Sequence, residues 1–150
     1  MRYEASVVVN RPIEEVWAFL THPFNIPRFS RWTLGLRQHP PGPMGPGTTW
    51  EGRTVFLGSE RRITGVVTEW DPPHAVSWSM MMPGIKSGSQ RYSLEPTGEG
   101  ARVVAVFEAE GKPLWKLLWP IVAPFVRRQA DATLRDIKRL LESGEAIDVH

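Results

Sequence analysis

The chain has 150 residues, 41% of them hydrophobic and 23% charged, so it can bury one core and is not disordered throughout. It contains no cysteine, which excludes disulfides, thiolate metal sites and a thiol nucleophile. The 18 basic and 16 acidic residues leave a net charge of +2 without a long basic run, so nucleic-acid binding is not indicated.

We expect a single domain over residues 1–144 and a C-terminal tail over 145–150. The first residues lack the apolar run of a signal peptide, and no apolar run is long enough to span a membrane. These observations predict a cytoplasmic protein.

The first quarter of the chain predicts a strand, two short helices and a second strand. Residues 1–9 alternate as a strand does. Asn10 is the expected N-cap of a helix that ends near Leu20, and residues 21–29 suit a second short helix or an irregular turn. A strand is predicted over 32–38.

Strands then dominate, and turn sequences rich in proline and glycine separate them. The five predicted strands cover residues 48–57, 60–70, 74–82, 88–95 and 101–110. The order of elements therefore predicts an α+β fold, in which a curved antiparallel sheet of about seven strands packs against one long C-terminal helix.

The last segment, residues 113–143, has helical periodicity. Pro120 and Pro124 remove hydrogen bonds near its start, so we expect a kink or a split there. The predicted apolar stripe consists of Leu118, Val122, Phe125, Gln129, Ala130, Leu134, Ile137 and Leu141.

Hairpin register predicts which face of the sheet is buried. If Gly58 and Ser59 form a two-residue turn, Leu57 lies opposite Glu60, and one face of this hairpin is apolar while the other is charged. The predicted inner face of the hairpin consists of Trp50, Gly52, Thr54, Phe56, Arg61, Ile63, Gly65, Val67 and Glu69. The same reasoning extends this face to Val76, Trp78, Met80, Gln90, Tyr92, Leu94, Val103, Ala105 and Phe107.

Several motifs resemble the START-like, or SRPBCC, superfamily, which includes polyketide cyclase/dehydrase, lipid-transport and birch-pollen-allergen-type proteins. They are residues 10–17 (NRPIEEVW), 68–74 (TEWDPPH), 92–96 (YSLEP) with 98–100 (GEG), and the helix end over 134–142. The resemblance covers residues 2–143. It implies the helix-grip fold, with a hydrophobic cavity between the sheet and the long helix.

The resemblance and the apolar inner face together suggest that the chain binds a hydrophobic or aromatic small molecule, such as a lipid or a polyketide-like compound. No metal and no cofactor are implied, because the four histidines lack ligand spacing and no dinucleotide or phosphate-loop fingerprint is present. The candidate ligand-binding residues are Trp50, Phe56, Arg61, Ile63, Val67, Val76, Trp78, Met80, Gln90, Tyr92, Phe107, Leu118, Val122 and Phe125.

An alternative is an aromatase/cyclase- or dehydratase-like enzyme that acts by positioning its substrate. Arg61 and Tyr92 would polarise carbonyls and Glu69 would serve as an acid or base. The competing readings are an arginine at the rim that extends to solvent, a core tyrosine, and a glutamate at the end of the sheet. We favour these interpretations for all three residues, so binding remains the leading hypothesis.

The cluster of Trp115, Leu117, Leu118 and Trp119 has more bulky apolar side chains than one helix face needs. It could form a lid, a homodimer contact or a peripheral membrane contact. The favoured interpretation is that it packs over the mouth of the cavity. A protein-interaction module that uses this edge is the second alternative function.

Overall fold

The computed structural model describes residues 2–22, 25–29, 35–41, 44–56, 58–81 and 85–144, without the side chains of Pro27, Phe56 and Ile85. The predicted tail over 145–150 lies outside the described residues. The elements are β1 (Arg2–Val9), α1 (Ile13–Thr21), α2 (Ile26–Phe29), β2 (Gly35–His39), β3 (Thr49–Phe56), β4 (Ser59–Asp71), β5 (Ala75–Met81), β6 (Ile85–Pro96), β7 (Ala101–Gly111) and α3 (Pro113–Glu142).

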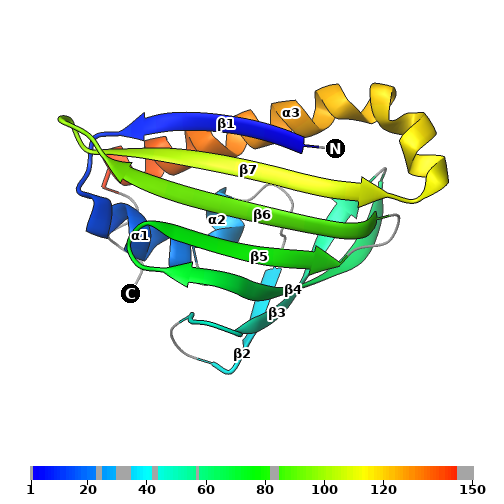
Figure 1. The fold of residues 1–150 in the computed structure, drawn as a ribbon, viewed down its shortest axis with the longest axis horizontal. Helices are drawn as coiled ribbons and strands as arrows, with labels where there is room; N and C mark the ends of the chain where they lie inside the picture. Colours follow the sequence, from blue (N-terminus) through cyan, green and yellow to red (C-terminus); the bar gives the residue numbers. More distant parts are fainter. Residues whose placement is uncertain are drawn as a thin grey trace.

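The strands form one curved antiparallel sheet in the order β1-β7-β6-β5-β4-β3-β2. Strands β2 to β7 follow one another as neighbours, and β1 joins the far side of β7, so β1 and β2 are the two edges of the sheet. Helix α3 lies along the β1–β7 side of the sheet, and α1 and α2 cover the same face at the other end of the long axis from the start of α3 (Figure 1). The predicted α+β fold of seven strands and one long helix is confirmed.

Helix α1 begins later than predicted. Its N-cap is Pro12 rather than Asn10, and the Pro12 carbonyl accepts hydrogen bonds from the N–H groups of Glu15 and Val16. The backbone N–H of Asn10 instead donates to the carboxylate of Glu142. The prediction of Asn10 was wrong because the ring of Pro12 fixes φ near −58°, which suits the residue that enters the helix.

Helix α3 is continuous over 30 residues, so the two internal prolines do not split it. Its first turns (yellow) bend away from the axis of the remaining helix (orange), as expected for prolines at positions 120 and 124 (Figure 1).

The C-terminal end of α3 is fixed to the connection between β1 and α1 by charged side chains. Arg11 donates from Nε to the Leu141 carbonyl at 2.9 Å and from Nη2 to the Glu142 carbonyl at 3.2 Å. Lys138 Nζ donates to the Val8 carbonyl at 2.7 Å and to the Glu142 carboxylate at 2.6 Å. Arg11 thus satisfies carbonyl groups at the negative end of the helix, and Lys138 joins that end to β1.

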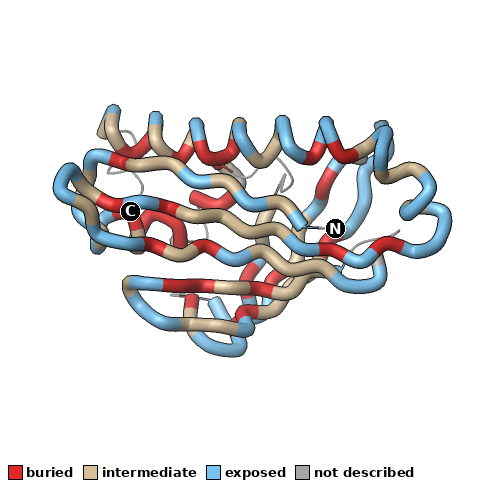
Figure 2. Tube along the Cα trace, turned by 45° about the horizontal axis from the view of Figure 1, so that its top comes forward, coloured by how far each residue is buried: buried red, intermediate tan, exposed pale blue. Residues whose placement is uncertain are grey.

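The hydrophobic core is densest beside this polar anchor. Its fully buried side chains come from the helices and from the inner face of the sheet, and the buried turns of α3 face the strands (Figure 2). They include Val9, Val16, Leu20, Val76, Val103 and Ile137. The anchored half of α3 therefore rests on a closed core.

The charge of Glu142 contributes stability that depends on pH. The hydrogen bond from Lys138, and the further contacts with Asn10 and Arg11, lower the pKa of the Glu142 carboxyl. Because the pKa of Glu142 is lower in the folded state than in the unfolded state, its carboxylate stabilises the fold at pH values above the unfolded-state pKa. This stabilisation disappears as the pH falls through the folded-state pKa.

We expect Glu142→Gln to lower the free energy of unfolding by about 0.5–1 kcal/mol at pH 7. Urea titrations of both proteins should show this difference fading below about pH 4; a deficit that stays constant with pH would contradict the argument.

Candidate functional site

Up to Val67, the β3–β4 hairpin has the inner face that was predicted, although the pairing differs. Phe56 pairs with Ser59 and Thr54 pairs with Arg61, so the turn begins one residue earlier than Gly58-Ser59. Gly58 adopts φ 77°, a left-handed conformation that glycine allows without strain. The shift moves each partner by two positions, and because side chains alternate with a period of two, each keeps its predicted face.

Glu69 lies on the outer face of the sheet, not on the inner face where it was predicted. The pairing of β4 with β5 shifts between Val67 and Glu69, so that Glu69 lies opposite Ser77. An extra residue in one strand reverses the alternation beyond it. Glu69 accepts hydrogen bonds from Ser77 Oγ at 2.9 Å and from Arg91 Nε at 2.8 Å, and these bonds lower the pKa of its carboxyl.

An aromatic cluster forms the closed end of the inner face. The ring of Tyr92 lies 5.7 Å from that of Trp78 and 6.4 Å from that of Phe29 on α2. Both Tyr92 and Trp50 are buried. Burial raises the pKa of the Tyr92 hydroxyl, so this group is neutral near pH 7 and can donate a hydrogen bond.

Burial on the inner face of β5, β6 and β7 decreases over the stretch that follows the aromatic cluster, before Ala109 on β7 is buried again. On β6, Leu94 and Tyr92 are buried but Gln90 is half-buried, and on β7, Val103 is buried but Phe107 is half-buried. On β5 the change falls between Trp78 and Met80. Water therefore reaches a stretch of the apolar inner face around Met80, Ala105 and Phe107. The helix side chains that are half-buried over this region include Leu118, Trp119 and Val122.

The buried stripe of α3 differs from the predicted one in its first half. Phe125 is 47% exposed, whereas Ala123 and Val126 are buried. Successive side chains point about 100° apart around the helix axis, so whether Phe125 or Val126 is buried decides which side of α3 faces the sheet. Sequence periodicity did not separate them because apolar side chains surround this part of the helix.

Other predicted residues have different environments. Ile63, Val67 and Val76 are buried within the core. Arg61 is exposed near the tip of the β3–β4 hairpin, as expected for an arginine at the rim. The side chain of Phe56 lies outside the described part of the chain.

Thr54 is a polar group on the inner face to which the sequence assigned no role. The residue is fully buried, and among the described residues its Oγ1 has no hydrogen-bond partner. A buried hydroxyl without a partner costs stability unless a ligand or a water molecule completes it. The sequence signal for this group was present, because Thr54 falls at a predicted inner position of the strand, between Gly52 and Phe56.

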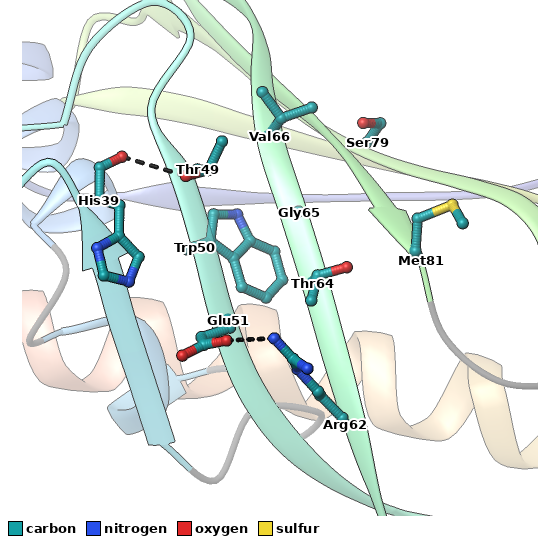
Figure 3. A pocket seen from close by; sticks show the side chains of 10 residues that line it. All are labelled: His39, Thr49, Trp50, Glu51, Arg62, Thr64, Gly65, Val66, Ser79 and Met81. Carbon is teal, nitrogen blue, oxygen red and sulfur yellow. Dashed lines mark hydrogen bonds and ion pairs between the residues drawn. The ribbon is translucent and has the colours of Figure 1, made fainter.

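A separate hollow of about 360 Å³ lies on the outer face, over β2 to β5 (Figure 3). Its rim includes the ion pair of Arg62 and Glu51 at 2.6 Å. The ring of Trp50 covers Gly65, and a Cβ at position 65 would overlap that ring. The lining residues are His39, Thr49, Trp50, Glu51, Arg62, Thr64, Gly65, Val66, Ser79 and Met81.

Within the described ranges, no three His, Asp or Glu side chains lie together as a metal site would require. A membrane-spanning helix is likewise not found there, since none of the helices combines sufficient length with sufficient hydropathy.

Comparisons with known proteins agree with this architecture. The family model described as polyketide cyclase / dehydrase and lipid transport matches residues 1–142. An uncharacterized protein of Mycobacterium tuberculosis is 27% identical over 144 residues, which cover 91% of this chain and 96% of the relative.

Solved structures with the same fold have low sequence identity to this chain. TTHA0849 from Thermus thermophilus superposes with a TM-score of 0.75 at 20% identity, covering 95% of this chain and 99% of that one. Ara h 8.0201 gives 0.73 at 15% identity, covering 95% and 98%. The di-domain aromatase/cyclase StfQ of the steffimycin pathway gives 0.75 at 15% identity, covering 96% of this chain and 51% of StfQ.

Position 65 should tolerate only glycine. Gly65→Ala places a methyl group against the buried ring of Trp50, and overpacking of this kind costs about 1–3 kcal/mol. Gly35→Ala on β2 is the matched control, because no atom lies within 4 Å of a Cβ there. Thermal and urea unfolding should show the loss for the first variant only. Equal stability of the two variants would show that the Trp50 ring moves aside freely.

Removal of the unpartnered hydroxyl should stabilise the free protein. Thr54→Val replaces a buried hydroxyl without a partner by a methyl group of similar size, and we expect a gain of about 1 kcal/mol in the free energy of unfolding. Urea titration of protein freed of small molecules measures this difference. A loss of more than about 1 kcal/mol would mean that the hydroxyl has a structural partner, such as a bound water molecule.

Proposed function

The chain belongs to the polyketide cyclase / dehydrase and lipid transport family, and on that basis we propose that it binds a hydrophobic or aromatic small molecule between the inner face of the sheet and α3. The observation that carries this proposal is the lower burial of one apolar stretch of the inner face, on β5 to β7. Apolar residues such as Met80, Ala105 and Phe107 are accessible to water on the same face that forms the core at its other end. A bound apolar molecule would cover them and would complete the core.

Few polar groups accompany this apolar surface. The neutral hydroxyl of Tyr92, the hydroxyl of Thr54 and the half-buried amide of Gln90 lie on inner-face positions of β6 and β3. Sparse polar groups among apolar ones orient a ligand that carries one or two oxygen atoms on a largely hydrocarbon or aromatic body. We infer a ligand of this class rather than a highly charged one, since none of these three groups carries a charge near pH 7.

Binding is favoured over cyclisation of a polyketide chain. Of the three candidate catalytic residues, Arg61 is exposed and Glu69 is held on the outer face by Ser77 and Arg91. Only Tyr92 remains on the inner face, and a single neutral hydroxyl does not supply an acid and base pair. The aromatase/cyclase StfQ shares the fold at 15% identity, a likeness that carries no residue roles to this chain.

A substitution that fills the proposed site should block binding. Ala105 is half-buried on the inner face of β7, and Ala105→Phe would occupy the space next to Tyr92, its partner across the sheet. Val106→Phe is the matched control, because it adds an aromatic ring one residue further along on the opposite face. Native mass spectrometry of freshly purified protein would detect a small molecule that co-purifies, and titration with 1-anilinonaphthalene-8-sulfonate would measure access of an apolar probe.

We expect the wild type and Val106→Phe to take up the probe alike and Ala105→Phe to bind it at least about tenfold more weakly, with all three proteins folded. Equal uptake by the two variants would place the probe elsewhere and would contradict the proposed site.

A further inference from the structure

Helix α3 carries a second apolar stripe on the side away from the sheet. It consists of Leu114, Leu117, Ile121 and Phe125, which we call the outer stripe. Their exposed fractions are 65%, 79%, 76% and 47%. Steps of three and four residues place them on one face of the helix. Four large apolar side chains that are exposed together, rather than singly, indicate a surface that contacts another apolar phase.

Between the exposed Glu110 and Asp131, the segment that holds the outer stripe has charges of a single sign. Residues 112–130 include Lys112, Lys116, Arg127 and Arg128 and no Asp or Glu, although the whole chain has a net charge of only +2. All four cations are exposed. The first half of α3 therefore combines an exposed apolar stripe with a local charge of +4.

We propose that the outer stripe docks on the surface of an anionic lipid bilayer. Leucine, isoleucine and phenylalanine would enter the boundary between headgroups and acyl chains, while the lysines and arginines would contact anionic headgroups. The half-buried Trp115 and Trp119 belong to the same helical turns, and indole rings are favoured at this depth. The helix lies on the surface in this arrangement, in agreement with the finding that no described helix can span a membrane.

Two features of the chain favour a bilayer over a second copy of the protein. A two-fold contact through the outer stripe would bring the same four cations of both copies together, without an acidic residue in the segment to compensate them. The first part of the helix also lies beyond the ends of the strands, which leaves it prominent at one end of the molecule (Figure 1). The interpretation favoured from the sequence is that the cluster of residues 115–119 packs over the cavity mouth. That interpretation does not account for the exposure of Leu117 or of the neighbouring Leu114.

The test is co-sedimentation of the full chain with vesicles of phosphatidylcholine alone and of phosphatidylcholine with about one third phosphatidylglycerol. We expect binding to the anionic vesicles, weak binding to the neutral ones, and a decrease in binding as salt increases. Leu117→Gln/Ile121→Gln removes apolar surface at two exposed sites without a change in charge or a strong change in helix propensity. This double variant should bind at least about tenfold more weakly while its circular dichroism and Tm remain near those of the wild type.

A pair of charge reversals provides the matched control. Arg128→Glu lies beside the outer stripe, whereas Arg135→Glu makes the same change two turns further along α3, in its anchored half. Only Arg128→Glu should weaken binding to anionic vesicles, by several-fold. The proposal is overturned if the wild type does not bind these vesicles, or if the double variant binds as the wild type does. It is also overturned if the double variant instead abolishes a dimer seen by sedimentation without lipid. Binding of the apolar probe to the inner face is measured separately, so failure of one proposal leaves the other standing.

Discussion

The contact between the C-terminal half of α3 and the core determines how the rest of the molecule is arranged. Ile137 and its neighbours are buried against the inner face of the sheet, and Arg11, Lys138 and Glu142 join the helix end to the start of α1. Further along, the hydroxyl of Tyr3 on β1 donates to Asp131 at 2.6 Å. The helix is therefore held over about its last twelve residues, and its first half is free to bend at the prolines. The closed core, the accessible inner face and the outer stripe all follow from this asymmetry.

Much of the fold could be predicted because each side chain of a strand can point to only one of the two faces of the sheet. The inner positions of β5, β6 and β7 were predicted correctly, and in the structure Gln90 pairs with Phe107 and Tyr92 with Ala105. The hairpin of β3 and β4 tolerated an error in its turn, because a shift of two residues preserves the faces. The position of Glu69 could not be predicted, since the shift of register after Val67 has no marker in the local sequence.

The candidate site was harder to predict than the fold. The burial of an inner-face side chain depends on how much of its strand α3 covers, and this coverage cannot be inferred from a single sequence. Phe125 and Val126 are both apolar neighbours, and only the packing of the helix shows that Val126 faces inward. Thr54 shows the same limit. A buried threonine hydroxyl usually has a hydrogen-bond partner, and this one has none among the described residues.

The two edges of the sheet have consequences for how the protein behaves at high concentration. Strand β1 is flanked by α3, but β2 ends the sheet on the other side with five residues, Gly35–His39. An unpaired edge strand offers its backbone to another chain, and long, flat, apolar edges promote aggregation. Here the edge is short, it exposes Arg37 and His39, and Pro40 and Pro41 follow it directly, so it cannot be extended by further backbone donors. Growth of a sheet from one molecule to the next is therefore disfavoured at the β2 edge.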